Sequence, residues 1–240
     1  METPRDRSAE WFVPRFGPTR FRYAAGLLFL PYTGMVLAFA TIGSLLASRV
    51  EWDRLVAIAV IYFLGLGIAA HALDALGSRG PKPWGEAFTR RQLWAWAGVS
   101  LAIAYAVAGY YMVRHVPRLW IVAALEGFFV FAYNLEWFGG RFHTDGWFAF
   151  SWGFLPVIAG YAMQTNGVSP GAVLVGLAAA LLSYVEIQAS RPYKELRRRS
   201  SPLDSEEAER MGRYEAILKG VSLGVICLGL GLLLARPFLR

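Results

Sequence analysis

Long apolar runs, separated by short polar segments, make up most of this sequence. Several of the runs approach or exceed the ~20 residues that an α-helix needs to cross the hydrocarbon core of a bilayer. The pattern predicts seven helices, at about 22–47, 54–77, 90–112, 118–136, 146–164, 170–189 and 213–235. We therefore expect an all-α polytopic membrane protein in which residues 22–235 form a single transmembrane domain.

Local signals indicate where several of these helices bend, begin or end. Pro31 and Gly34 predict a kink in the first helix, because a proline interrupts the backbone hydrogen bonds. Thr89 is placed to cap the third helix, and Pro170 suits the first turn of the sixth. A short helix capped by Asp204 or the residue after it should precede the seventh.

The N-terminal segment, residues 1–21, is basic and contains the aromatic residues Trp11, Phe12 and Phe16. This composition is typical of an amphipathic segment that lies among lipid headgroups. A partly ordered tail would fit the same residues equally well. The segment lacks the short apolar core of a secretory signal peptide.

Composition supports a membrane protein. Hydrophobic residues make up 56% of the chain and charged residues only 17%, whereas a soluble domain carries about 25% charged residues. The single cysteine, Cys227, rules out a disulfide framework and a cysteine metal site. The expected location is the cytoplasmic membrane of a prokaryote.

The distribution of basic residues predicts the orientation in the membrane. If the N-terminus is cytoplasmic, 18 Lys and Arg fall in the inner segments and 6 in the outer ones. This excess follows the positive-inside rule. It predicts an outer C-terminus and places the loops after the second, fourth and sixth helices in the cytoplasm. The formal net charge of +7 is then explained by topology rather than by nucleic-acid binding.

Polar residues that break the apolar pattern gather in three segments expected on the cytoplasmic side. These segments are 71–91, 133–146 and 183–213. In the first, His71, Asp74 and Ser78 are spaced i, i+3, i+7, so they share one face of a helix. A histidine and an acid at the end of an apolar helix each need a partner or a function.

The end of the sixth predicted helix repeats this spacing with Ser183, Glu186 and Ser190. Short patterns also recur by chance, and an acid at a helix end is often only a cap. Glu126 is different, because it lies in the middle of the fourth predicted helix. An acid at that depth usually points into a helix bundle or a cavity, or forms a structural hydrogen bond.

Carboxylates together with basic side chains are what a site for magnesium and a diphosphate requires. The carboxylates hold the hard cation through oxygen, and Arg and Lys balance the remaining phosphate charge. The two histidines would also allow a softer divalent metal. The candidate metal ligands are His71, Asp74, Glu136, His143, Asp145 and Glu186.

These residues resemble motifs of a known family, the UbiA superfamily of intramembrane prenyltransferases. Residues 70–84 with 89–93 are similar to its first Asp-rich motif and the segment that follows, and 183–194 falls where the second motif belongs. Tyr133-Asn134 and the later stretch 152–156 resemble the exit from its fourth helix and its fifth helix. The likeness covers roughly residues 20–235, although the family commonly has nine helices.

The resemblance implies a fold, a reaction and a set of roles. It implies a UbiA-like bundle in which Mg²⁺ bridges acids at the ends of the second and sixth helices to an isoprenoid diphosphate. Asp74 and Glu186 would hold the metal, while Tyr133 and Asn134 would stabilise an allylic cation. The implied diphosphate-binding residues are Arg79, Lys82, Arg191 and Lys194.

The sequence leaves several functions open. The first is metal-assisted transfer of an isoprenoid chain from a polyprenyl diphosphate to an acceptor that the sequence does not identify. The second is a non-catalytic lipid-binding relative, because each Asp-rich motif retains a single acid, Asp74 or Glu186. The third is another metal-dependent lipid enzyme that uses His71 and His143. Only Glu126 favours a transporter. The oligomeric state is not predicted.

Overall fold

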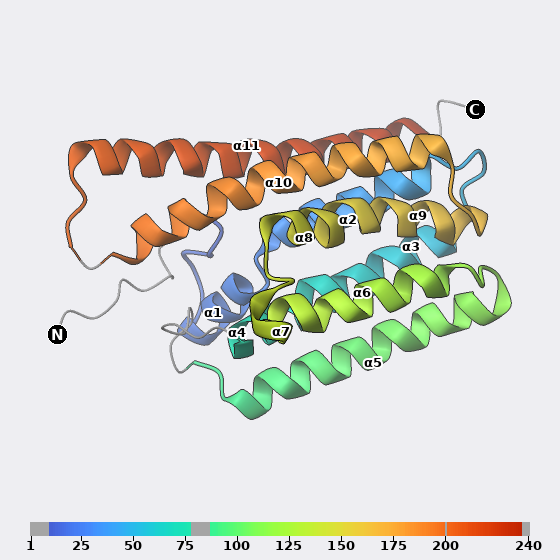
Figure 1. Cartoon of the computed structure of the whole chain (residues 1–240), viewed down its shortest axis with the longest axis horizontal. Coiled ribbons are helices and arrows are strands. Elements are labelled where there is room, and N and C mark those ends of the chain that lie inside the picture. Colours follow the sequence, from blue (N-terminus) through green and yellow to red (C-terminus); the bar gives the residue numbers. More distant parts are fainter. Residues whose placement is uncertain (1–9, 78–86, 200, 237–240) are drawn as a thin grey trace.

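The computed structural model describes residues 10–77, 87–199 and 201–236, and the regular elements within these ranges are all helical. Most of them run side by side along the long axis of the molecule (Figure 1). The first half of the chain forms α1 (Thr19–Leu27), α2 (Leu30–Leu45), α3 (Trp52–Tyr62), η2 (Phe63–Ala70), α4 (His71–Gly77), α5 (Arg90–Arg114) and α6 (Leu119–Asn134). The second half forms α7 (Trp137–Gly140), α8 (Asp145–Ala149), η3 (Phe150–Phe154), α9 (Leu155–Thr165), α10 (Pro170–Arg198) and α11 (Ser205–Ala235).

Five of the described helices are long and apolar enough to cross a membrane. They are Thr19–Leu45, Trp52–Gly77, Arg90–Arg114, Pro170–Arg198 and Ser205–Ala235. α6 is a shorter apolar helix, and α8, η3 and α9 together form one further continuous helical segment. The prediction of an all-α membrane protein is confirmed at this level of detail.

Two of the helical segments contain a π-helical stretch. η2 separates α3 from α4, and η3 separates α8 from α9. A π-helical turn holds one more residue than an α-helical turn, and such turns often occur at functional sites. Both stretches lie in segments that carry residues of the candidate site described below.

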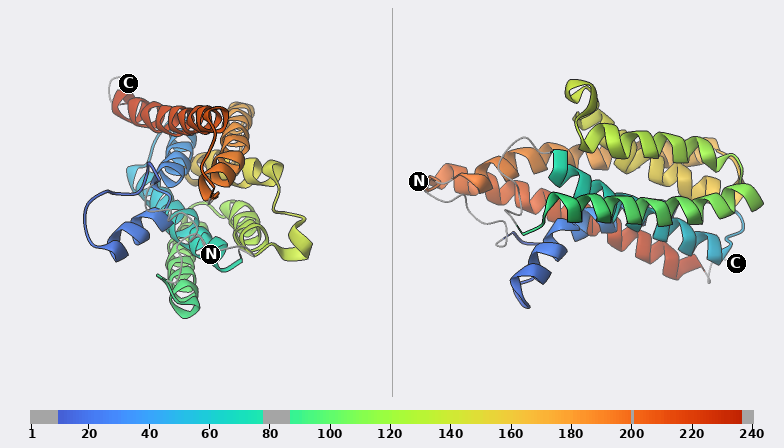
Figure 2. Two further views of the ribbon diagram at one scale, coloured as in Figure 1. Left: turned by 90° about the vertical axis from the view of Figure 1, so that its left-hand side faces the viewer. Right: turned by 90° about the horizontal axis from the view of Figure 1, so that it is seen from below.

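The first predicted helix is divided, but not at Pro31 or Gly34. The break lies at Leu28 and Phe29, and Phe29 adopts a left-handed backbone conformation with φ 44°. The proline explains this position, because its ring excludes an α-helical hydrogen bond to the carbonyl four residues earlier. The Thr33 hydroxyl donates to the carbonyl of Leu28 at 2.7 Å and satisfies an acceptor that the break exposes. α1 consequently leaves the bundle at a steep angle (Figure 2).

α2 and α9 pack with their backbones in close contact. A Cβ atom added to Gly43 would lie 2.1 Å from the carbonyl oxygen of Val157, and one added to Gly160 would lie 2.0 Å from that of Ala40. The Ser44 hydroxyl donates to the carbonyls of both Ala40 and Gly160, at 3.0 and 3.2 Å. Small residues allow this approach, which is a common way for helices to associate in membranes.

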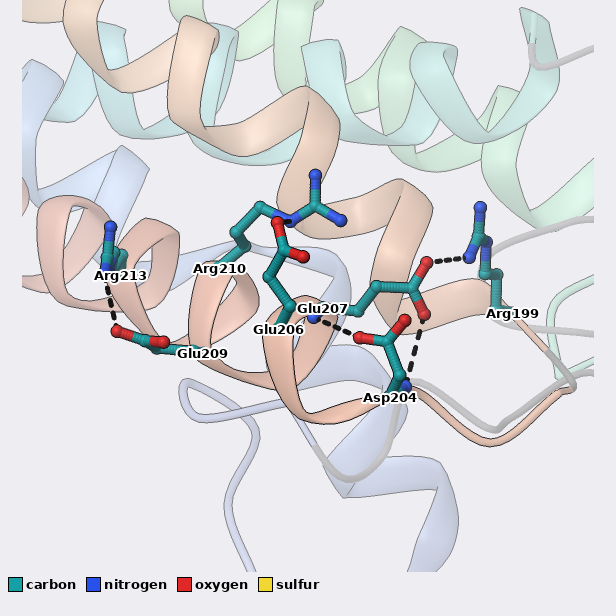
Figure 3. A network of polar contacts seen from close by, with 7 residues as sticks. All are labelled: Arg199, Asp204, Glu206, Glu207, Glu209, Arg210 and Arg213. Carbon is teal, nitrogen blue, oxygen red and sulfur yellow. Dashed lines mark hydrogen bonds and ion pairs between the residues drawn. The ribbon is translucent and has the colours of Figure 1, made fainter.

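α10 and α11 are both longer than the sequence predicts. α10 continues through Pro192 to Arg198 instead of ending near residue 189. α11 begins at Ser205, so the predicted short helix is the first part of the last long one. Asp204 caps α11 by accepting a hydrogen bond from the backbone N–H of Glu207 at 2.8 Å (Figure 3). Asp204 is one of the two caps that the sequence predicts for this position. The predicted cap at Thr89 is also confirmed.

A carboxyl group lies within the apolar part of the bundle, between α3 and α6. The Tyr62 hydroxyl donates to Oε1 of Glu126 at 2.8 Å. Oε2 of Glu126 is buried and has no hydrogen-bond partner among the described residues. The hydrogen bond from Tyr62 thus provides a partner for one of the two carboxyl oxygens of Glu126, the acid in the middle of an apolar helix.

The C-terminal ends of α4, α6 and α10 lie at one end of the bundle (Figure 1). The α2–α3, α5–α6 and α9–α10 connections lie at the opposite end (Figure 1). The described parts of the three polar segments therefore adjoin one end of the bundle, as the helix order predicts.

Candidate ligand-binding site

A cavity of about 570 Å³ opens at the end of the bundle where α4, α6 and α10 finish. Eight of the twelve predicted site residues line it. They are His71, Asp74, Tyr133, Asn134, Glu136, His143, Arg191 and Lys194. Sequence positions more than one hundred residues apart thus contribute to one concave surface, which is the usual form of a small-molecule site.

Of the remaining four predicted residues, two lie outside the described residues and two are described but do not line the cavity. Arg79 and Lys82 lie outside the described residues. Asp145 lies beside the cavity in an ion pair, and Glu186 is fully buried nearby without reaching the lining.

Close helix packing brings the ends of α4 and α6 together. A Cβ atom added to Gly77, the last residue of α4, would lie 2.1 Å from the backbone oxygen of Asn134. After α6 the chain turns sharply, with positive φ angles at Glu136, Gly139 and Gly140. Glycine adopts such angles without strain, so this turn explains the glycine pair of the sequence. The turn returns His143 to the end of α6, where its Nδ1 lies 3.0 Å from the carbonyl oxygen of Tyr133.

Six aromatic rings form a continuous row in the cavity wall. In order they are Phe29, His71, Trp152, Phe148, Tyr133 and His143. Neighbouring ring centroids are 5.1, 5.3, 5.3, 5.9 and 4.4 Å apart along this row. The two histidines are therefore stacked members of an aromatic wall, which holds each ring in a fixed orientation.

The C-terminal half of α10 forms a basic wall of the cavity. Arg191, Lys194, Arg198 and the following Arg199 all line it. The first three are spaced i, i+3, i+7 and so share one face of the helix. The ammonium group of Lys194 lies 5.1 Å from the centre of the Phe29 ring, where the basic wall meets the aromatic row.

Arg191 connects this helix to two other segments. Its Nε forms an ion pair with Oδ1 of Asp145 at 2.7 Å, and its Nη2 donates to the carbonyl of His143 at 3.5 Å. The Gln188 amide donates to Oδ2 of Asp145. Oδ2 of Asp145 thus accepts a hydrogen bond from α10, while the buried Oδ1 pairs with Arg191 by charge without the geometry of a hydrogen bond. The carboxylate therefore acts on the position of Arg191.

Arg199, at the other end of the basic wall, is held by α11. Its guanidinium pairs with Glu207, the same residue that completes the cap of α11 with Asp204 (Figure 3). The contact ties the mouth of the cavity to the start of the last helix. Exposed ion pairs such as Arg213–Glu209 lie farther along α11 (Figure 3).

Glu186 faces the bundle interior. Neither of its carboxylate oxygens has a hydrogen-bond partner among the described residues, and the same holds for the Ser183 hydroxyl. Ser183 lies against η3, where a Cβ atom added to Gly153 would meet its hydroxyl at 2.7 Å. Ser190 accepts a hydrogen bond from Tyr32 at 2.9 Å. The repeated sequence spacing therefore does not place Glu186 opposite Asp74 in the same wall.

The burial of Glu186 leads to a prediction about stability. We expect Glu186→Met to raise the free energy of unfolding by about 1 kcal/mol, because it removes, at nearly constant volume, a buried carboxyl that has no hydrogen-bond partner among the described residues. Thermal unfolding in detergent micelles measures the change. Glu206→Met, at a side chain that is 80% exposed, is the control and should leave stability within about 0.5 kcal/mol. A lower stability for the Glu186 variant would contradict the prediction.

The donor groups of the described structure do not form a ready-made metal centre. Within residues 10–77, 87–199 and 201–236, no three His, Cys, Asp or Glu side chains come close enough to hold a metal ion together. Asp145 is occupied by Arg191 and Gln188, and Glu186 is outside the cavity. The predicted magnesium ligands therefore do not fit a site built from these protein groups alone.

Several lining residues were not singled out from the sequence. Phe29, Trp152 and Phe148 complete the aromatic row, and Arg198 and Arg199 extend the basic wall. The spacing of Arg191, Lys194 and Arg198 could have identified the basic face if the sixth helix had been extended through Pro192. The aromatic row carries no local signal, since its rings come from separate segments of the chain.

No protein-family model matches the chain, and no curated protein or solved structure is significantly similar to it.

Proposed function

We propose that this chain is a UbiA-like intramembrane prenyltransferase that moves an isoprenoid chain from a polyprenyl diphosphate to an acceptor. The observation that carries the proposal is the pairing of an aromatic row with a basic helix face in one cavity, at the end of an apolar helical bundle. An isoprenoid diphosphate has the matching chemistry, an apolar chain joined to a strongly anionic group.

The proposed reaction breaks the allylic C–O bond, and the electron pair leaves with the diphosphate. Arg191 and Lys194 would balance the charge that develops on the leaving group. The ring face of Tyr133 would stabilise the positive charge on the allylic carbon. That carbon then bonds to the acceptor nucleophile, whose proton would pass to the carboxylate of Asp74 in the same cavity.

In the membrane, we propose seven spans with a cytoplasmic N-terminus. The five long apolar helices would be joined by α6 and by the segment from α8 to α9. The excess of Lys and Arg in the segments at the cavity end supports an inward-facing site. The proposed location is the cytoplasmic membrane of a prokaryote, where polyprenyl diphosphates would enter from the cytoplasmic leaflet.

A non-catalytic lipid-binding protein is the second candidate. The burial of Glu186 away from the cavity favours it, because only one of the two acids implied by the Asp-rich motifs faces a ligand. Such a protein would bind the same amphiphile in the same cavity and release it unchanged.

Transfer of a radiolabelled isoprenoid by the purified full-length protein in phospholipid nanodiscs tests the proposed reaction. We expect Tyr133→Leu to lower the transfer rate roughly thirty-fold, which corresponds to the loss of a desolvated cation–π interaction of about 2 kcal/mol. Tyr133→Phe is the matched control and should keep most of the rate, because the ring face is retained. The assay is run with a panel of acceptors, with and without Mg²⁺. Bound but untransferred isoprenoid under every condition would favour the non-catalytic candidate.

A further inference from the structure

Arg191 is anchored at the edge of the cavity in a way that orients its guanidinium. Asp145 pairs with Nε, and the His143 carbonyl accepts from Nη2. An arginine side chain has five N–H donors in a planar fork. The Tyr133 hydroxyl is a further hydrogen-bond partner of Arg191, and together these contacts fix the plane of the group. The remaining donors are available to a ligand in the cavity that Arg191 lines. An oriented guanidinium is well suited to a phosphate oxygen pair.

The carboxylates around the cavity are distributed differently from those of a metal-dependent diphosphate site. Asp145 forms an ion pair with Arg191 through Oδ1 and accepts a hydrogen bond from Gln188 through Oδ2, although Oδ1 itself accepts no hydrogen bond from the described residues. Glu186 does not line the cavity, and among the described residues no three metal-binding side chains come together. The part of α10 that lines the cavity carries three basic residues of the helix, Arg191, Lys194 and Arg198, against a single acid, Glu195. Asp74 and Glu136 are the acids that line the cavity from other segments.

We infer that the cavity binds a phosphate or diphosphate ester directly through the basic face of α10, with Arg191 as the anchor and Asp145 as the residue that positions it, and without a requirement for a divalent metal. This inference rests on the proposed function for the isoprenoid nature of the ester. It changes the role of Asp145 from a metal ligand to a positioning residue.

Basic residues at the cytoplasmic end of a membrane helix also serve as topology signals. Two observations separate the basic face of α10 from such a signal. Its side chains line a concave surface of about 570 Å³, and Arg191 is held in place by a carboxylate from another helix. A topology signal needs neither.

Binding of inorganic pyrophosphate to the purified full-length protein in neutral phosphatidylcholine nanodiscs tests the inference by calorimetry. We expect the dissociation constant in EDTA to lie within about three-fold of that in Mg²⁺, and Arg191→Gln to weaken binding about ten-fold or more. Arg213→Gln, at an exposed residue paired with Glu209, is the control for net charge and should leave binding unchanged. Binding that requires Mg²⁺ would overturn the inference, as would an unchanged affinity in the Arg191 variant.

A double-mutant cycle tests the positioning role of Asp145. Asp145→Asn alone should weaken pyrophosphate binding several-fold, but should have no further effect in the Arg191→Gln background. Glu209→Gln, which breaks the exposed pair with Arg213, is the matched control. Additive effects of the two substitutions at the cavity would contradict a role of Asp145 through Arg191.

Competition identifies the source of the ester and separates this inference from the proposed function. Geranyl thiodiphosphate is an analogue whose allylic C–S bond breaks only slowly. If it displaces pyrophosphate, the result supports both the inference and the proposed function. Displacement only by phosphatidylglycerol in the nanodisc would support the anion site and overturn the prenyl-diphosphate function. Prenyl transfer together with strictly Mg²⁺-dependent binding would support the function and overturn the inference. A protein that binds pyrophosphate under neither condition contradicts both.

Discussion

Replacing Gly160 with valine should destabilise the helical bundle by about 3 kcal/mol or more. A Cβ atom at this position would lie 2.0 Å from the backbone oxygen of Ala40 and 2.9 Å from the backbone nitrogen of Ser44. Backbone atoms cannot move aside as a side-chain end can, so α9 would have to separate from α2 along the contact. The separation would also lengthen the hydrogen bond from Ser44 to the carbonyl of Gly160, now 3.2 Å.

Gly224→Val is the matched control for this prediction. Gly224 lies in α11, and a Cβ atom there meets no heavy atom within 4 Å. Both substitutions add the same side chain to an apolar helix, so their difference measures the close helix contact. Unfolding in mixed micelles, followed by circular dichroism against denaturant concentration, gives the two free energies. Equal stability of the two variants would contradict the close packing of α2 and α9.

Tyr62→Phe should destabilise the protein by about 3 kcal/mol. The substitution removes the hydroxyl that donates to Glu126 at 2.8 Å and leaves this carboxyl without a described partner on either oxygen. A buried carboxyl that loses its partner keeps its full desolvation penalty, which exceeds the value of an ordinary hydrogen bond. The same unfolding measurement determines the change.

Two further variants check this explanation. Tyr62→Phe combined with Glu126→Leu should recover most of the loss, because neither polar group then remains. Tyr105→Phe is the control, since its hydroxyl donates at 2.8 Å to the backbone carbonyl of Ala123 rather than to a carboxyl. It should cost about 1 kcal/mol or less. A double variant as unstable as Tyr62→Phe alone would contradict the assignment to the Tyr62–Glu126 pair.

Much of the helical architecture could be predicted from hydropathy, because a membrane helix needs a long apolar run and little else. The errors lie where local and tertiary preferences compete. Pro31 predicts a break, but the strain is relieved earlier in the chain, at Phe29. Pro192 suggests an end, yet α10 continues past it to Arg198. Neither outcome follows from the proline alone, since it depends on the packing that surrounds each helix.

The candidate site could be predicted in part. Helix order alone places Asp74, Tyr133 and Arg191 at one end of the bundle, and the cavity unites them. Helical spacing does not reveal which face turns toward the cavity, so the sequence alone predicts Glu186 beside Asp74, whereas the structure buries it outside the cavity. The sequence also does not predict the partner of Asp145, because the ion pair with Arg191 joins residues from separate helices.

The two π-helical stretches determine the rotational register of the site. η2 ends at Ala70, immediately before His71 and Asp74, and η3 contains Trp152. Each residue of an α-helix advances the side-chain direction by about 100°. A π-helical turn accommodates an extra residue, so if the same residues of η2 were wound as a regular α-helix, His71 and Asp74 would rotate by roughly this angle relative to α3. The chain therefore maintains its cavity through wide turns in two separate helices, and a substitution that tightened either turn would reorient the site although it touches no ligand.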